Sequence, residues 1–333
     1  MFAWFRNKNV LFYRNFPVLT GGHLKVWDYF NHVKLISGYS SSIYFSPSSR
    51  WDKAADNPWL PVRSQCLNEW NPEVCDILFI EGLDWHVVPV SLREHPTNPV
   101  INLVQHVRHS FPDNERYPFL RYPAIRICVS AEVAEAIQAT GIVNGPVYTI
   151  PNGIDFSTLP KILEQGQRPY DLVICGLKNI PVAHALDKYI KAEYPDLKIK
   201  TLDSFIERAQ FISILSQAKT AIFLPNPTEG EGFYLPALES MALGTLVICP
   251  DSIGNRVFCV AGKTCLQPDY TIESFIQCFT QSQNLSENTR AILCQTAYQT
   301  AKIYNLEQER RAFATILKNT HKIWRDYFIK KIT

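Results

Sequence analysis

Two glutamates in the segment 228–245 have a type and spacing that could serve ligand binding or catalysis. Glu231 and Glu239 stand eight positions apart in the run TEGEGFYLPALESMALGT, which lies between apolar runs at 221–224 and 245–249. Ionised carboxylates accept hydrogen bonds, so they can hold neutral hydroxyl groups such as those of a ribose or a hexose. The pair therefore predicts a site for a polyol in the turn between two buried strands.

The residues around the two acids predict where each lies. Pro236 favours the first turn of a helix and Gly244 favours its end, which gives a helix over about 235–243. Glu239 then lies about one turn inside this helix, and Glu231 lies in the loop before it. Both can face the carboxyl end of the preceding strand, where ligands bind in open α/β sheets.

The expected start of this helix also offers backbone N–H groups. The amides of Gly232, Phe233 and Tyr234 would point outward there and favour an anion. Amides for phosphate oxygens and carboxylates for hydroxyls together suit a nucleotide-sugar, which carries phosphates between two polyols. A plainer interpretation is that the helix dipole favours an acid near a helix start. For either glutamate alone, the sequence favours this plainer interpretation.

The elements that must position these groups are short apolar runs separated by segments with helical spacing. The runs lie at 10–13, 42–45, 77–80, 100–104, 125–129, 147–150, 172–175, 198–202, 221–224 and 246–249. Strands that are apolar along their length predict parallel sheets covered on both faces, and their alternation with helices predicts doubly wound α/β units.

A chain of 333 residues suits two domains. The segment PNGID at 151–155 precedes a stretch that interrupts the strand–helix rhythm. We therefore expect an N-terminal Rossmann-like domain at 1–155 and a C-terminal one at 156–315. Residues 316–333 are expected to form a C-terminal helix that can return to the N-terminal domain.

Bulk composition narrows the class of protein. The formal net charge of +2 gives no indication of nucleic-acid binding. The nine cysteines form no CxxC pair, and several lie inside apolar runs, which favours buried free thiols in a reducing cytoplasm. The start, 1–10, is too short and too charged for a signal peptide, and no run of 18 apolar residues occurs. A cytoplasmic protein is expected, and peripheral contact with the inner face of a membrane stays open.

The run from Glu231 to Gly244 resembles the signature of retaining glycosyltransferases of family 4, whose two acids are likewise separated by seven residues. Other segments look like further motifs of that family, and the resemblance is strongest from Ile125 to Asp251. These segments are the glycine turn Thr20–His23, the Val129–Glu132 run, the PNGID run and the strand end Cys175–Asn179.

The resemblance implies the GT-B fold, in which two doubly wound Rossmann-like domains have parallel sheets that face a central cleft. It implies retaining transfer of a hexose from a nucleotide-sugar to an acceptor hydroxyl, in polysaccharide or glycoconjugate synthesis. UDP is the favoured nucleotide, and UDP-glucose is one candidate donor. The acceptor would be a carbohydrate or lipid-linked, and no cofactor is implied.

The resemblance also implies roles for single residues. Glu231 would hold hydroxyls of the transferred sugar, His106 would lie near that sugar, and Glu239 would hold the ribose hydroxyls. The residues expected to bind the donor are Gly21, Gly22, Gly176, Lys178, Phe205, Gly232, Phe233, Tyr234, Leu235 and Glu239. Leu177 stands where the family has an arginine, so the set of phosphate ligands stays open. Three further residues are weaker candidates, namely His109, Arg208 and Lys263; the last two are expected to be solvated surface.

Two other functions stay open at this point. No Asp-x-Asp motif occurs, so no metal-bridged diphosphate site is expected. A sugar-nucleotide epimerase could use the same fold. A non-catalytic scaffold of the same fold is the other alternative; the altered Gly176-Leu177 pair supports it, and the presence of both glutamates weighs against it.

Overall fold

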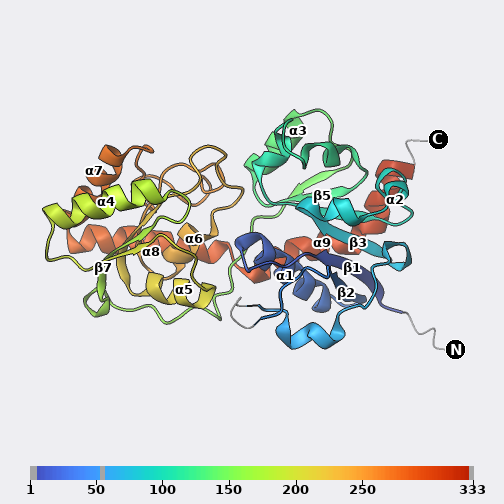
Figure 1. Cartoon of the computed structure of the whole chain (residues 1–333), viewed down its shortest axis with the longest axis horizontal. Helices are drawn as coiled ribbons and strands as arrows, with labels where there is room; N and C mark the ends of the chain where they lie inside the picture. The colour runs from blue at the N-terminus through green and yellow to red at the C-terminus, as the bar shows by residue number, and fades with distance from the viewer. Residues whose placement is uncertain (1–5, 53–56, 330–333) are drawn as a thin grey trace. The chain divides into compact units, whose positions relative to one another are not determined.

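The computed structural model describes residues 6–52 and 57–329, and the chain forms two compact units (Figure 1). Unit 1 contains residues 1–152 and 306–333, and unit 2 contains residues 153–305. The first half of the N-terminal segment considered above as a signal peptide, 1–5, lies outside the described residues, as do residues 330–333 of the expected C-terminal helix.

Unit 1 contains a six-stranded parallel sheet in the order β2-β1-β3-β4-β5-β6. Its strands are β1 (Lys8–Arg14), β2 (Tyr39–Phe45), β3 (Ile77–Glu81), β4 (Val100–Val104), β5 (Ile125–Cys128) and β6 (Val147–Thr149). Its α-helices are α1 (Gly21–Lys34), α2 (Val90–Glu94), α3 (Ala131–Ala139) and α9 (Leu306–Trp324). The strand order reverses between β1 and β3, so this unit has a topological switch point there.

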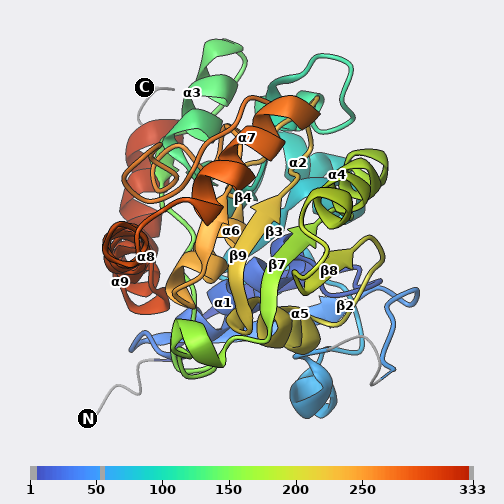
Figure 2. The same cartoon turned by 90° about the vertical axis from the view of Figure 1, so that its left-hand side faces the viewer.

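Unit 2 contains a four-stranded parallel sheet in the order β10-β9-β7-β8, and Figure 2 shows β7 between β9 and β8. Its strands are β7 (Tyr170–Cys175), β8 (Ile199–Leu202), β9 (Ala218–Phe223) and β10 (Leu246–Ile248). Its helices are α4 (Ile180–Glu193), α5 (Arg208–Ser216), α6 (Leu235–Ala242), α7 (Ile272–Gln283) and α8 (Glu287–Ile303).

All ten apolar runs lie on strands to within one residue, so the predicted α/β fold with parallel sheets is confirmed. The central strands are buried at successive positions, as in 172–175 of β7 and 220–223 of β9. Because successive side chains point to opposite faces, both faces of the sheet are covered. On one face, Leu172 and Ile222 pack in a core with Leu186 of α4 and Phe275 of α7.

The division of the chain differs from the expected boundaries at 155 and 315. The structure divides after Asn152 and after Asn305, and α9 begins directly at Leu306. Figure 1 shows α9, in red, beside α1 and β1, in blue. Phe313 of α9 packs edge-on against Tyr29 of α1, with ring centroids 4.8 Å apart. The helix that returns to unit 1 therefore begins at Leu306, about two and a half turns before 315.

Two further properties bear on the sequence-based expectations. All nine cysteines are free thiols in this structure, and seven of them are buried. Across 6–52 and 57–329, no helix is long and apolar enough to cross a membrane.

Candidate functional site

The carboxyl ends of β7 and β9 lie at the switch point of unit 2, where the strand order reverses. The chain continues from β7 to β8 on one side and then returns to β9 on the other. The crevice outside such a point is where open α/β sheets bind ligands. The loop 176–179 follows β7 and the loop 224–234 follows β9, so both segments expected to bind a ligand lie at this edge.

Local capping places Lys178 at this edge. The side chain of Asn179 accepts a hydrogen bond from the Val182 N–H at 3.5 Å and so caps α4, while Pro181 occupies the first turn. Both features fix the start of the helix. Lys178 therefore stands directly before a defined helix N-terminus, two residues beyond the strand-end glycine Gly176.

Lys178 and Glu231 form an ion pair across the two loops. Lys178 Nζ donates to Glu231 Oε1 at 2.5 Å, and the Asn226 N–H donates to the same oxygen at 3.1 Å. The ammonium also lies 5.5 Å from the centroid of the Tyr234 ring, within the range of a cation–π contact. The Lys178 side chain is 48% exposed and that of Glu231 is 10% exposed, so the ammonium can meet a ligand from solvent. Within the described residues, Glu231 Oε2 accepts no hydrogen bond.

The loop after β10 holds the backbone of Glu231 in place. The Glu231 N–H donates to the Ser252 carbonyl at 2.8 Å, and the Gly254 N–H donates to the Glu231 carbonyl at 3.0 Å. Between them, Ile253 has φ +69°, and it is the one non-glycine residue with positive φ among those described. A β-branched residue in this region is strained, and such strain persists only where the surroundings enforce it.

Gly254 brings this loop close to the glycines of the motif. A Cβ at Gly254 would stand 2.3 Å from the carbonyl carbon of Gly232 and 2.6 Å from the backbone nitrogen of Phe233. Any larger residue would therefore displace the backbone of Gly232 and Phe233, whose amides are expected to meet an anion. That residues 250–255 hold the backbone of Glu231 was not predicted from the sequence. The Asp-x-x-Gly-Asn pattern at 251–255 is the sequence feature that could have indicated it.

Glu239 is paired with an arginine that the sequence-based reasoning placed on the solvated surface. Glu239 is 1% exposed on α6, and its Oε1 accepts a hydrogen bond from Arg208 Nη2 at 2.5 Å. Arg208 is the first residue of α5, at the end of the loop after β8, and its side chain is 30% exposed. The expectation of a solvated Arg208 is therefore wrong. Lys263 is exposed, as expected.

The helix dipole does not explain the two acids. The first turn of α6 contains no acidic residue. Glu239 is the fifth residue of the helix, and Glu231 lies four residues before its first residue, Leu235. The dipole effect falls off within the first turn. Both carboxylates are instead held by cations from neighbouring strand-end loops, which the plainer interpretation did not require.

The amides before α6 differ in part from the expectation. The Tyr234 N–H donates to the Gly254 carbonyl at 3.4 Å, and the Leu235 N–H donates to the Phe233 carbonyl at 3.0 Å. These two amides are therefore occupied. The amides of Gly232 and Phe233 donate to no acceptor in the described part of the chain, so they stay available for an anion.

Two other expected donor-binding residues of unit 2 have distinct surroundings. A Cβ at Gly176 would stand 2.2 Å from the Ala183 Cβ, so this glycine is required for close packing of α4 on β7. Phe205 lies in the loop after β8 and is 52% exposed, and Leu177 is 50% exposed. Exposed apolar side chains at this edge offer a surface for a flat ring, whereas Leu177 offers no phosphate ligand.

The expected site residues of unit 1 lie at the carboxyl ends of its strands. Gly21 and Gly22 are the first two residues of α1, so the expected glycine turn is a helix N-terminus capped by Thr20. His106 follows β4, and its Nδ1 accepts a hydrogen bond from the Arg108 N–H at 3.1 Å. His109 is buried, and burial lowers the pKa of its imidazole to about 3, helped by the nearby Arg116.

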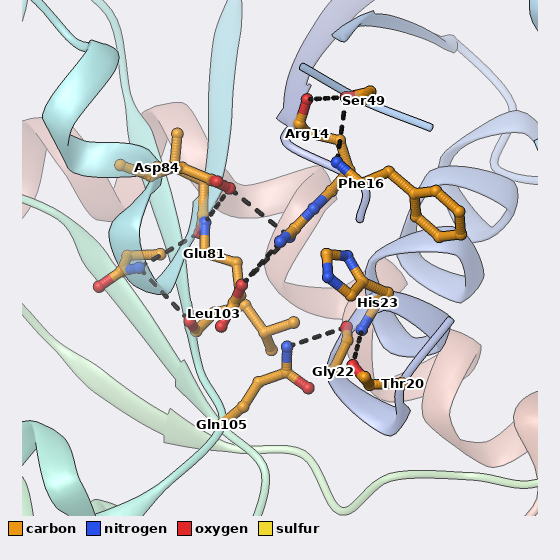
Figure 3. A network of polar contacts seen from close by, with 12 residues as sticks. Arg14, Phe16, Thr20, Gly22, His23, Ser49, Glu81, Asp84, Leu103 and Gln105 are labelled. Atoms are coloured by element: carbon orange, nitrogen blue, oxygen red, sulfur yellow. Dashed lines mark hydrogen bonds and ion pairs between the residues drawn. The ribbon is translucent and has the colours of Figure 1, made fainter. Parts of the chain in front are cut away.

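A charged network at the switch point of unit 1 was missed from the sequence. Arg14 at the end of β1 donates through Nη1 and Nη2 to Glu81 Oε2 at the end of β3, both at 3.1 Å, and Asp84 Oδ2 lies 3.6 Å from Nη1 (Figure 3). The His23 ring lies beside this guanidinium in Figure 3. Burial, together with Arg14, lowers the pKa of the His23 imidazole to about 3, so this ring stays neutral. The sequence feature that indicates this network is a charged residue directly after each of two apolar runs, Arg14 after 10–13 and Glu81 after 77–80.

Asp84 is expected to make the stability of unit 1 depend on pH. Burial is the main cause that raises its pKa from 3.8 to about 7, against the attraction of Arg14. As the pH rises between these values, the unfolded state loses the proton before the folded state does, so the stabilising contribution of protonated Asp84 is lost. As the pH rises through this range, the unfolding free energy of wild type should therefore fall relative to that of Asp84→Asn.

Urea denaturation across this pH window measures that difference. Tryptophan fluorescence is a suitable signal because all seven tryptophans fall in residues 1–152 and 306–333. Asp113→Asn, at an exposed aspartate of the same unit, is the control. Parallel pH profiles for wild type and Asp84→Asn would show that Asp84 titrates alike in both states.

The donors at these edges are not arranged as a metal site. In the part of the chain that the structure describes, no group of three or more His, Cys, Asp or Glu side chains could hold a metal ion. Unit 2 instead presents one ammonium, one guanidinium, two carboxylates and two available amides. This set can bind an anion beside hydroxyl groups.

No protein-family model matches the sequence, and no curated protein matches it. Solved structures do match over most of the chain. Sucrose-phosphate synthase from Thermosynechococcus elongatus is 11% identical, with a TM-score of 0.66, over 94% of this chain and 99% of that one. HepE from Anabaena, in complex with UDP and glucose, is 12% identical, with a TM-score of 0.67, over 94% of this chain and 100% of that one.

A third similar structure is the UDP-forming alpha,alpha-trehalose-phosphate synthase from Burkholderia vietnamiensis. It is 13% identical, with a TM-score of 0.62, over 94% of this chain and 100% of that one. At such identities the likeness concerns the fold alone, and these proteins share the two-sheet α/β architecture described above. The chain thus has the GT-B fold of these glycosyltransferases.

Proposed function

We propose that this protein is a retaining glycosyltransferase that moves a hexose from a UDP-sugar to an acceptor hydroxyl without a metal ion. The observation that carries the proposal is the pair of carboxylates at the strand-end edge of unit 2. Glu231 and Glu239 each have one oxygen held by a cation, while the other oxygen accepts no hydrogen bond from the described residues. Two fixed acceptors beside a lysine and free amides suit a nucleotide-sugar better than a simple phosphate.

In this proposal the diphosphate binds between Lys178 and the amides of Gly232 and Phe233. An ammonium has three donors, so Lys178 can keep its hydrogen bond to Glu231 and still donate to a phosphate oxygen. The amides add fixed partial positive charge where the leaving diphosphate becomes more negative. Leu177 removes one cation from the set that the resemblance implies, which makes Lys178 the principal charged ligand.

The transfer exchanges one C–O bond for another. The bond from the anomeric carbon to the phosphate oxygen breaks, and its electron pair stays on the diphosphate. The acceptor oxygen attacks the oxocarbenium-like sugar from the face that the diphosphate leaves, and its proton passes to a diphosphate oxygen. The negative charge of Glu231 offsets the positive charge that develops on the sugar, while Glu239 holds the ribose hydroxyls throughout.

The likeness to solved structures supports the choice of donor. HepE binds UDP and glucose in one of its structures and UDP-glucose in another. The acceptor is proposed to be a carbohydrate or a lipid-linked hydroxyl, in polysaccharide or glycoconjugate synthesis. The roles expected for Gly21, Gly22 and His106 of unit 1 rest on the resemblance and are part of this proposal.

Calorimetric titration with UDP in EDTA tests the proposal first, because binding should persist without divalent metal. Incubation with UDP-sugars, with and without candidate acceptors, then shows whether a sugar is transferred and with which anomeric configuration. Product formed with an inverted anomeric centre, or a strict need for manganese, would contradict the proposal. Epimerised nucleotide-sugar formed without any acceptor would indicate the epimerase alternative.

Lys178→Ala is expected to weaken UDP binding about tenfold to a hundredfold and to leave uridine binding nearly unchanged. A hydrogen bond from a charged donor to a phosphate accounts for a loss of this size. Titration of both ligands into the variant measures the two effects. Lys188→Ala, at an exposed lysine on α4, is the matched control. An equal loss for uridine and UDP would mean that Lys178 acts only through the fold.

A further inference from the structure

Arg208 connects two segments of unit 2 that have separate expected roles. It begins α5, directly after the loop 203–207 that follows β8, and it reaches Glu239 on α6 with a hydrogen bond of 2.5 Å. The loop contains Phe205, an expected donor-binding residue whose exposed ring offers a surface for the base, and Glu239 is proposed to hold the ribose. The arginine therefore couples the part of the site for the base to the part for the sugar.

Charge makes this contact necessary for Glu239. The Glu239 side chain is 1% exposed, and an ionised carboxylate at such a position needs a cation or further hydrogen bonds. Among the described residues, Arg208 is the cation that pairs with this carboxylate. Without this ion pair the buried carboxylate would lack a compensating charge, and nothing else among the described residues would fix its orientation.

Geometry shows how the arginine sets the direction of the carboxylate. Oε1 is taken by Arg208, while Oε2 accepts no hydrogen bond from the described residues. A planar guanidinium fixes the orientation of a carboxylate better than a lysine does. The open oxygen is thus presented in one direction.

We propose that Arg208 is a positioning residue that selects ribonucleoside diphosphates over 2′-deoxyribonucleoside diphosphates. By holding the Glu239 carboxylate in one orientation, it presents Oε2 to the ribose hydroxyls, and the 2′-hydroxyl is the one that a deoxy ligand lacks. This inference rests on the proposed function, because it assumes that a nucleoside diphosphate binds at the edge formed by β7, β8 and β9.

The test compares each nucleotide with its 2′-deoxy form. UDP, GDP and ADP are titrated into wild type, and the tightest of them is paired with its deoxy analogue for all variants. Wild type should prefer the ribose form about tenfold to a hundredfold, as expected for one hydrogen bond to a charged acceptor. Arg208→Gln should reduce affinity for the ribose form by a similar factor, leave the deoxy form nearly unchanged and bring the ratio close to one.

Two further variants separate positioning from folding. Arg208→Lys keeps a cation beside Glu239 but loses the planar fork, so it should fold and show an intermediate ratio. Lys219→Gln is the matched control, because Lys219 forms a half-exposed ion pair with Asp171 at the amino ends of β9 and β7. The control should keep the wild-type ratio.

The outcomes distinguish this inference from the proposed function. Arg208 variants that weaken both forms equally, or that keep the wild-type ratio, would overturn the inference. A wild-type ratio near one, with tight UDP binding, would also overturn it while the donor site stands. If wild type binds GDP or ADP more tightly than UDP, and the Arg208 variants lose the preference for ribose over deoxyribose, the role of Arg208 is supported. The assignment of uridine as the base is then wrong. No binding of any nucleotide would overturn both proposals.

Discussion

Glu231→Gln is expected to lower turnover about a hundredfold to a thousandfold and to leave the affinity for UDP nearly unchanged. Loss of one group that stabilises charge in the transition state has effects of this size. Because UDP lacks the transferred sugar, an interaction with that sugar cannot contribute to UDP binding. A fall in kcat without a change in UDP affinity is therefore the signature of an interaction made in the transition state.

The structure makes glutamine a suitable replacement at this position. A glutamine oxygen can still accept from the Asn226 N–H and from Lys178 Nζ, which now reach Glu231 Oε1 at 3.1 and 2.5 Å. The shape of the loop should therefore survive, and only the negative charge is removed. Lys178 would keep its position near the Tyr234 ring and remain a ligand for phosphate.

Steady-state rates with the active UDP-sugar and calorimetric titration of UDP measure the two effects. Glu273→Gln is the control, because Glu273 is an exposed glutamate in the first turn of α7 and so has the role that the helix-dipole interpretation assigns. That interpretation predicts for both variants a stability loss of about 0.3–1 kcal/mol and an unchanged rate. Equal rates for Glu231→Gln and wild type would remove Glu231 from the reaction.

Much of the fold could be predicted because it depends on local patterns. Each strand of a parallel sheet covered on both faces must be apolar along its length, and the run 221–224 shows this directly. The limits of α6 follow from Pro236 in its first turn and from Gly244, whose φ of +69° strongly favours glycine. Each of these features depends on a few residues that are neighbours in the sequence, so it can be recognised without the structure.

The partners of the two glutamates could not be predicted because they depend on contacts between distant segments. Lys178 reaches Glu231 from 53 residues away, and Arg208 reaches Glu239 from 31 residues away. Nothing in the local sequence around Arg208 distinguishes it from an exposed arginine at a helix start. The same limit hid the network of Arg14, which pairs with Glu81 across 67 residues at the switch point of unit 1.

Glu309→Ala is expected to destabilise unit 1 by about 3–5 kcal/mol, the usual loss when one partner of a buried ion pair is removed. The Glu309 carboxylate on α9 is fully buried and accepts from Lys25 Nζ at 2.6 Å, with His32 Nε2 at 3.0 Å. Burial lowers the pKa of the Lys25 ammonium, but Asp28 and Glu309 more than offset this and raise it above its ordinary value. Alanine would leave this buried cation paired with Asp28 but without the Glu309 carboxylate.

Urea denaturation followed by tryptophan fluorescence measures this loss in unit 1, which contains all seven tryptophans. Glu307→Ala is the matched control in the same helix, because Glu307 also pairs with arginines, Arg310 and Arg311, but its side chain is 44% exposed. Exposed pairs are screened by water, so the control should change little. If the two variants were equally stable, the buried ion pair would not hold α9 on α1, and the apolar contact of Phe313 with Tyr29 would be the main stabilising feature.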